Sequence, residues 1–126
     1  MGIGVREVDF VIIGCTDIDR SVEFYGTTIG LQKSKQWGSM PAHEFETGNV
    51  TLAVMQTDAF GQGFVPSSQP VAFQVDDVAA AKAELQANGV EFPMDSIDSG
   101  VCNMAFFADP DGNALMLHHR YAPKAP

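Results

Sequence analysis

The chain repeats itself, and this internal duplication limits its possible folds more than any other feature. An apolar run at residues 8–14 precedes one predicted helix, which ends at Gly30, and a second run at 71–75 precedes another, which ends at Gly89. Runs of this length are typical of buried strands, and a glycine after a helical pattern marks the end of the helix. About sixty residues separate the copies, which indicates a duplicated unit.

Each half carries the same local signals. Asp17 and Asp77 stand where a side chain can cap the first turn of a helix. A Gly-Asn pair, at 48–49 and again at 112–113, precedes a short apolar strand near the end of each half. The predicted helix stripes are Ile18, Val22, Tyr25 and Ile29 in the first half, and Val78, Ala81 and Leu85 in the second. Each half is therefore predicted to run strand, helix and three strands, which is a βαβββ module.

The segment between the halves is rich in glycine yet apolar. Residues 58–69 include Phe60, Phe64 and, next to it, Val65, which a solvated linker seldom displays. The segment could close over a pocket or meet a second subunit, or its rings could seal the seam between the halves. We therefore expect one domain over 1–126, with a first module at 1–57, a connecting loop at 58–69 and a second module at 70–126.

Composition excludes several classes of partner. The chain has 126 residues, 45% of them hydrophobic, which suffices for one ordinary core. Its formal charge is −9, from 16 acidic and 7 scattered basic residues, so neither nucleic acid nor an anionic membrane is an expected partner. Cys15 and Cys102 lack metal-ligand spacing, and two reduced thiols are typical of a cytoplasmic protein.

Three motifs in order resemble one known family. They are Asp-Ile-Asp-Arg-Ser-Val-Glu-Phe-Tyr at 17–25, Val-Ala-Phe-Gln-Val-Asp-Asp-Val at 71–78 and Phe-Ala-Asp-Pro-Asp-Gly-Asn at 107–113. Together they resemble the vicinal oxygen chelate superfamily, which contains glyoxalase I, extradiol dioxygenases and bleomycin-resistance proteins. The resemblance implies an α+β fold whose tandem βαβββ modules form a curved mixed sheet, with an internal cup, helices on the convex face and a homodimer.

The resemblance also implies four positions for metal ligands, and this chain fills none of them with the expected donors. Metal-dependent members use His, Gln or Glu there, whereas the residues here are Phe10, Ala53, Pro70 and Met116. Ring, methyl and pyrrolidine groups have no donor, and a lone thioether is a soft ligand. We therefore expect no metal in the family's position and no cofactor, although ligands from other strands could still form a relocated site.

Strand alternation then predicts which side chains line the cup. They are mostly apolar, with several methionines and a few polar groups, which is typical of a site that holds an organic ligand. The alternative is that they fill the interior of a small protein. The predicted ligand-binding residues are Phe10, Ile12, Trp37, Ala53, Met55, Ala72, Gln74, Cys102, Met104, Phe106, Met116 and His118.

His118 is the candidate for catalysis, because an imidazole can donate, accept or move a proton near neutral pH. Adjacent strand residues face opposite ways, so His118 and His119 do not form a chelating pair. Glu44 and Glu46 share a face and could join His118 in a relocated site, or they could lie on an ordinary solvated face. The carboxylates of 109–112 are better explained by a hairpin turn than by a calcium loop.

Three functional hypotheses follow. The first is a metal-independent protein that binds a small organic molecule, cationic or aromatic, as in the bleomycin-resistance branch. The second is a lyase, isomerase or dioxygenase with relocated metal ligands. The third is a metal-free enzyme that uses His118, with Gln74, for proton transfer, so the sequence leaves open whether the protein is an enzyme.

Overall fold

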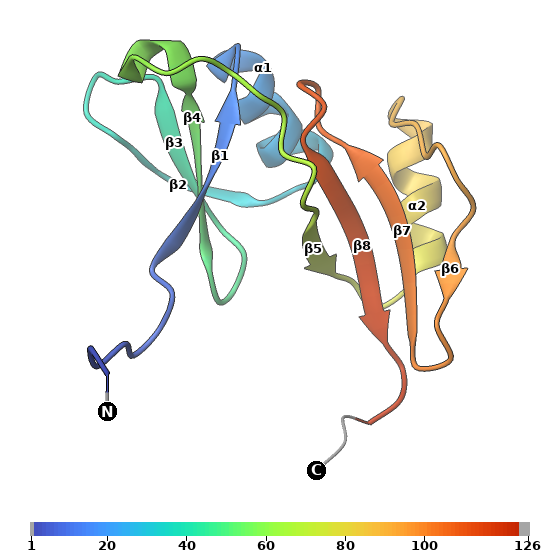
Figure 1. The fold of residues 1–126 in the computed structure, drawn as a ribbon. Helices are drawn as coiled ribbons and strands as arrows, with labels where there is room; N and C mark the ends of the chain where they lie inside the picture. The colour runs from blue at the N-terminus through green and yellow to red at the C-terminus, as the bar shows by residue number, and fades with distance from the viewer. Residues whose placement is uncertain (1, 124–126) are drawn as a thin grey trace. The chain divides into compact units, whose positions relative to one another are not determined.

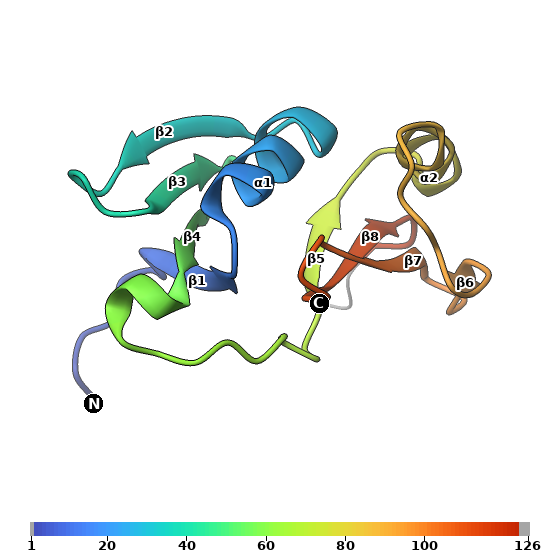
Figure 2. The same cartoon turned by 90° about the horizontal axis from the view of Figure 1, so that it is seen from above.

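The computed structural model describes residues 2–123 and divides the chain into two compact units, Met1–Val65 and Pro66–Pro126. Each unit contains a four-stranded mixed sheet with a helix against one of its faces (Figures 1 and 2). The strand and helix order of the two units is the predicted duplication, so the α+β fold class is confirmed.

Unit 1 is built around sheet A, in which the strand order is β1-β4-β3-β2. Strand β1 runs parallel to β4, and the other neighbours are antiparallel. The strands are β1 (Phe10–Cys15), β2 (Gln32–Gln36), β3 (Ala42–Glu46) and β4 (Thr51–Gln56). The helical elements are α1 (Ile18–Glu23), the π-helix η1 (Phe24–Thr28) and the 3-10 helix η2 (Thr57–Phe60).

The first helix begins as predicted but changes its winding. The Asp17 side chain accepts a hydrogen bond from the Arg20 amide at 3.2 Å, which caps α1. After six residues of α1 the helix widens into η1, and this widening turns different side chains towards the sheet. Ser21, Phe24 and Tyr25 are buried, whereas Ile18, Val22 and Ile29 of the predicted stripe are half-buried. Of the predicted stripe, only Tyr25 is fully buried, and the sequence did not predict the burial of Ser21 and Phe24.

The core of unit 1 lies between the helices and one face of sheet A. The register pairs Ile13 with Val54 and Phe45 with Leu52, and all four side chains are buried. Tyr25 from the helical segment packs against Phe45, with ring centroids 6.2 Å apart. The opposite face of sheet A is covered by neither α1 nor η1 (Figure 2).

Unit 2 repeats this plan in sheet B, in which the strand order is β5-β8-β7-β6. Its elements are β5 (Val71–Gln74), α2 (Val78–Ala87), β6 (Ile97–Asp98), β7 (Cys102–Ala108) and β8 (Ala114–Arg120). Asp77 caps α2 by accepting a hydrogen bond from the Ala80 amide at 3.0 Å. Val78 and Leu85 of α2 are buried with Phe107 and Leu117 of the sheet, which form the core of this unit.

The turn between β7 and β8 is held by a buried polar network. Asp109 is only 5% exposed and accepts hydrogen bonds from the Asp111 amide, the Asn113 amide and the Asn113 side chain at 3.0, 2.9 and 2.8 Å. The Oδ1 atom of the Asn113 side chain accepts in turn from the Ser67 amide at 2.9 Å. This is the predicted hairpin turn, in which Asp109 accepts local backbone amides.

Within residues 2–123, every helix falls short of the length and apolar character that crossing a bilayer requires.

Candidate functional site

The open face of sheet A brings together the predicted site residues of unit 1. The register pairs Ile12 with Ala53, and Phe10 lies two residues before Ile12 on the same face. Met55 lies two residues beyond Ala53. Phe10 and Ile12 are 46% and 54% exposed, so they do not fill the core of unit 1.

Three aromatic rings meet over this face. The ring centroids of Phe10 and Trp37 lie 6.0 Å apart with an interplanar angle of 76°. Phe60 approaches the other side of Trp37, at 6.3 Å and 88°. Edge-to-face geometry of this kind is favourable for aromatic pairs and fixes the indole between its neighbours. We call Phe10, Trp37, Phe60 and Glu44 the aromatic cluster.

Glu44 belongs to this cluster by a direct hydrogen bond. The register pairs Glu44 with Ala53, and Trp37 Nε1 donates to Glu44 Oε2 at 2.6 Å. Among residues 2–123, the other carboxylate oxygen, Oε1, has no protein partner. From the sequence, Glu44 could belong either to a relocated site or to an ordinary solvated strand face. The register of β3 with β4 places it beside Ala53.

Glu46 lies on the same strand face but is engaged differently. It accepts hydrogen bonds from Ser34 at 2.6 Å and from Thr51 at 2.7 Å. These two hydroxyl donors hold the pKa of the Glu46 carboxyl below its usual value. Both carboxylate oxygens of Glu46 are therefore occupied, in contrast to Glu44.

The segment after β4 comes close to the same face. A Cβ atom on Gly14 would meet the Thr57 methyl group at 2.8 Å and the Phe64 ring at 3.8 Å, so this contact requires glycine. Phe60 and Phe64 of the predicted connecting loop thus lie against unit 1, and Phe60 adds a ring that the sequence did not assign to the site.

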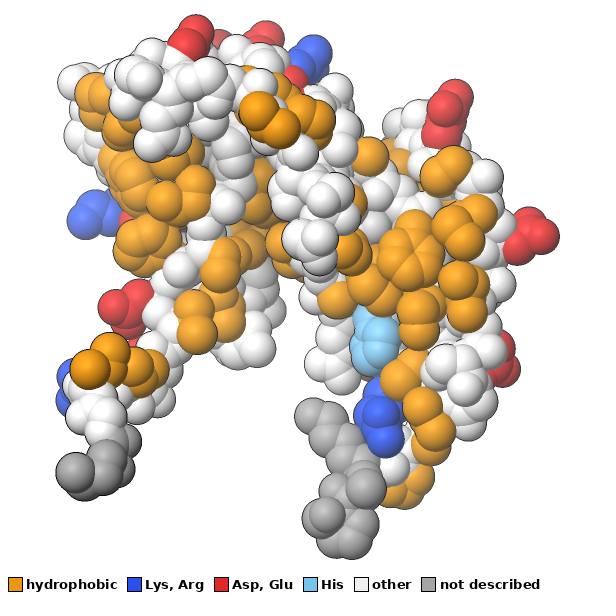
Figure 3. All heavy atoms as spheres, in the orientation of Figure 1, with side chains coloured by type: hydrophobic (Ala, Val, Ile, Leu, Met, Phe, Trp, Pro, Cys, Tyr) orange, Lys and Arg blue, Asp and Glu red, His pale blue; other side chains and the backbone are white. Residues whose placement is uncertain are grey.

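The open face of sheet B brings together the predicted site residues of unit 2. The register pairs Met116 with Ala72 and with Phe106, and it pairs His118 with Gln74 and with Met104. Hydrophobic side chains gather over β7 and β8 on this side, beside a histidine (Figure 3). Met104, Phe106, Met116 and His118 are half-buried, whereas Cys102 is 7% exposed. A role for these residues in binding a ligand stays a prediction.

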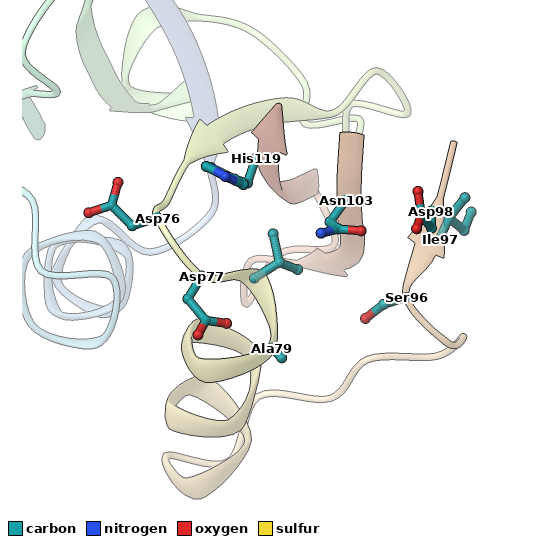
Figure 4. Close-up of a pocket in the computed structure, with 9 residues that line it drawn as sticks. Asp76, Asp77, Ala79, Ser96, Ile97, Asp98, Asn103 and His119 are labelled. Carbon is teal, nitrogen blue, oxygen red and sulfur yellow. The ribbon is translucent and has the colours of Figure 1, made fainter. Parts of the chain in front are cut away.

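His119 points to the other side of sheet B, where it lines a pocket. The pocket has a volume of about 380 Å³, and Figure 4 shows its lining side chains. The residues are Asp76, Asp77, Val78, Ala79, Ser96, Ile97, Asp98, Asn103 and His119. None of them was a predicted site residue. Two of its carboxylates serve local structure, because Asp77 caps α2 and Asp98 accepts from the Tyr121 hydroxyl at 2.7 Å.

The positions that the family resemblance implies for a metal do not suit a divalent ion. Phe10, Ala53, Pro70 and Met116 offer no oxygen or nitrogen donor in their side chains. Glu44 lies opposite Ala53, but its Oε2 atom accepts from the Trp37 indole. In the described part of the chain, no three His, Cys, Asp or Glu side chains gather as metal ligands would.

Comparison with known proteins gives one consistent family. The family model described as the glyoxalase/bleomycin resistance protein/dioxygenase superfamily matches residues 7–117. A glyoxalase domain-containing protein of Mycosarcoma maydis is 29% identical over 122 residues, covering 91% of this chain and 69% of that protein.

Two solved structures have the same fold. A glyoxalase family protein of Bacillus anthracis superposes with a TM-score of 0.79 at 22% identity, over 95% of this chain and 99% of that one. A Streptomyces protein described as antibiotic-binding superposes with a TM-score of 0.78 at 21% identity, over 94% and 99% of the two chains.

Proposed function

Because this chain belongs to the glyoxalase/bleomycin resistance protein/dioxygenase superfamily, we propose that it binds a small organic molecule without the divalent metal ion of the superfamily's enzymes. The aromatic cluster is the observation that carries this proposal. It offers exposed ring surface and a carboxylate oxygen without a protein partner on the open face of one sheet. The side chains at the implied metal positions lack the required donors, which supports independence from that ion.

The chemistry of the cluster favours a planar ligand with a positive charge. Aromatic rings bind flat organic groups and attract cations through their faces. The indole N–H holds one oxygen of Glu44 in place, and the other oxygen can accept a charge-assisted hydrogen bond from an ammonium or amidinium group. The net charge of −9 adds long-range attraction for a cation. A protein of the same fold is described as antibiotic-binding, which supports a binding role.

The test uses Trp37, which is the single tryptophan of the chain. Planar acridinium cations and uncharged isosteres of the same shape are titrated while Trp37 fluorescence and heat of binding are recorded. We expect the cations to quench Trp37 and to bind more tightly than the isosteres. Recovery of the ligand chemically unchanged after incubation separates binding from turnover.

Glu44→Gln is the decisive variant, and Glu46→Gln is its matched control on the same face of the same strand. A charge-assisted hydrogen bond contributes about 1.5–3 kcal/mol, so Glu44→Gln should weaken cation binding by about 10-fold or more. Glu46→Gln should leave the affinity unchanged. Equal affinities in both variants would overturn the proposal. So would unchanged Trp37 fluorescence with every compound titrated.

We also propose that the protein is a cytoplasmic homodimer. The edge strand β1 exposes Val11 and Ile12 by 38% and 54%, and an apolar edge of this kind is typical of a protein interface. Within the described residues neither cysteine forms a disulfide, as is usual in a reducing compartment. Sedimentation equilibrium should give twice the 13.5 kDa chain mass, and a monomer at micromolar concentration would contradict the dimer.

A further inference from the structure

A row of polar side chains ends the apolar face of sheet B that packs against α2. Along β7 the buried residues Ala105 and Phe107 lie on this face, and Asn103 lies on the same side near the start of the strand. The register pairs Asn103 with His119 of β8 and with Asp98 of β6. The three side chains therefore form a row across three neighbouring strands, on the side of the sheet opposite to His118.

Two side chains of this row have no partner in the protein. Among residues 2–123, neither the Asn103 amide nor the His119 ring takes part in a hydrogen bond, although both residues are half-buried. The Nδ1 atom of His119 is buried, whereas Nε2 is not. A buried polar atom without a partner costs stability, and proteins accept such costs mainly at functional sites. The row is therefore a candidate for contact with a bound molecule.

The row lines the pocket of about 380 Å³ on the α2 side of sheet B. Figure 4 shows Asp76 and Asp77 on one side of this hollow and Ser96 and Asp98 on the other. Its volume falls within the range of small-molecule sites, about 300–1,000 Å³. The family resemblance implies a ligand cup on the open side of the sheet, so this pocket is a different place in the fold.

The charge of the lining favours a cation. The described residues that line the pocket include three aspartates and neither lysine nor arginine. Asp77 and Asp98 already accept local hydrogen bonds, whereas Asp76 forms no hydrogen bond or ion pair within residues 2–123. Lys82 reaches the lining at the Ser96 hydroxyl, to which its Nζ atom donates at 3.4 Å. The carboxylate of Asp76 is therefore available to a positively charged molecule.

We propose that this pocket binds a small organic ammonium ion that also carries hydroxyl groups, of the amino-polyol class. Asp76 accepts from the ammonium group by a charge-assisted hydrogen bond. The Asn103 amide and His119 Nε2 supply further donors and acceptors, which match hydroxyl groups. A metal ion does not suit the pocket, because no three His, Cys, Asp or Glu side chains of the described residues gather to hold one. The proposal does not depend on ligand binding at the aromatic cluster.

The experiment compares three compounds of equal chain length. Glucamine has an ammonium group and hydroxyl groups, sorbitol has hydroxyl groups without the charge, and hexylamine has the charge without hydroxyl groups. Calorimetry should show one glucamine bound per chain, with sorbitol and hexylamine each at least about 5-fold weaker. In NMR spectra of the unaltered protein, glucamine should shift the Asn103 side-chain amide and the His119 ring signals. Unshifted signals, or equal affinity for the three compounds, would overturn the proposal.

Asp76→Asn is the decisive variant, and Asp95→Asn is its matched control. Both aspartates are exposed, and Asp95 lies in the same unit but outside the pocket lining. Asp76→Asn should weaken glucamine binding by about 5-fold, the effect of one exposed ion pair, and Asp95→Asn should leave it unchanged. Equal weakening in both variants would describe only the general attraction of an acidic protein and would overturn the proposal.

Two further variants test the imidazole and the identity of the site. His119→Phe keeps a ring but removes both nitrogens, so it should weaken glucamine binding by about 10-fold without lowering the melting temperature. Unchanged affinity in this variant would contradict the role of His119. Glu44→Gln should leave glucamine binding unaltered, which separates this proposal from the proposed function. Weaker glucamine binding in Glu44→Gln would place the compound at the aromatic cluster and overturn the assignment to the pocket.

Discussion

The two sheets share a strand order but present different chemistry on their open faces. On sheet A, the residue paired with Ile12 in the parallel ladder is Ala53, and rings and a carboxylate surround it. On sheet B, the equivalent pair is Ala72 and Met116, with sulfur and imidazole groups around it. The open faces of a duplicated module have thus diverged, while its strand order has not.

The closed faces of the two sheets differ much less. Phe45 and Val54 are buried beneath the helical segment of unit 1, and Phe107 and Leu115 are buried in unit 2. These side chains must fill a close-packed interior, so their size and apolar character are constrained. Open-face residues do not carry this constraint, which leaves them available for binding.

The largest expected effects come from the closed faces. Phe45→Ala should destabilise the protein by about 3–5 kcal/mol and Leu115→Ala by about 2–5 kcal/mol, because each removes a side chain that is no more than 1% exposed. Urea unfolding, followed by circular dichroism, measures both values. Val65→Ala is the control, since Val65 is 83% exposed and should change stability by less than about 0.5 kcal/mol. A loss below about 1 kcal/mol in either core variant would contradict the assignment of the closed faces.

Substitutions in the hairpin turns should have effects of intermediate size on stability, and these effects should differ between the two units. Asp109→Ala leaves the buried Asn113 amide groups without their acceptor, which should cost about 1–3 kcal/mol. In unit 1, the exposed Asn49 accepts from the neighbouring Val50 amide and the Thr47 hydroxyl, so Asn49→Ala should cost less than about 0.5 kcal/mol. The same unfolding measurement compares them, and equal losses would show that the two turns are energetically equivalent.

The sequence predicted the fold well because the fold depends on periodic signals. The caps at Asp17 and Asp77 and the turn at 109–113 involve residues close in sequence, and these predictions were confirmed. The change from α1 to the π-helix η1 was not predicted, since helical periodicity does not distinguish the two windings, and the contact of Tyr25 with the distant Phe45 was not predicted either.

The candidate site was predicted less completely, since its polar partner depends on register. Alternation alone placed Phe10 and Ile12 on one face, but only the pairing of β3 with β4 places Glu44 opposite Ala53. Phe60 joins Trp37 through the 3-10 helix η2, which carries no periodic signal in the sequence. The binding role of every site residue stays a prediction for the experiments above.

Removal of the helix caps should destabilise the two units by similar amounts. The cap residues Asp17 and Asp77 have nearly the same backbone angles, with φ of −143° and −142°. Each accepts one amide hydrogen bond, so Asp17→Ala and Asp77→Ala should each cost about 1 kcal/mol. Asp17→Asn and Asp77→Asn keep the acceptor and serve as controls that should retain most of the stability. A difference above about 1 kcal/mol between the two alanine variants would contradict equivalent capping.

The smallest effect concerns His43, which lies on the closed face of sheet A opposite Val54. Burial lowers the pKa of His43 below its usual 6.5, and Lys33 lowers it further, whereas Asp19 acts in the opposite direction. Its Nδ1 atom is buried without a hydrogen-bond partner. The folded state therefore favours the neutral imidazole, and below the usual pKa the unfolded chain binds more protons. Stability should fall as the pH drops from 6.5 through the lowered pKa.

His43→Gln cannot titrate and should lose less stability than the unaltered protein over that interval. Urea unfolding at several pH values measures this difference, and an NMR titration of the His43 ring measures its pKa directly. Carboxylates contribute to acid unfolding in both proteins, so subtracting the two curves isolates the imidazole. Parallel stability curves, or a measured pKa at or above 6.5, would show that His43 is hydrated and that the closed face of sheet A admits water beside β3.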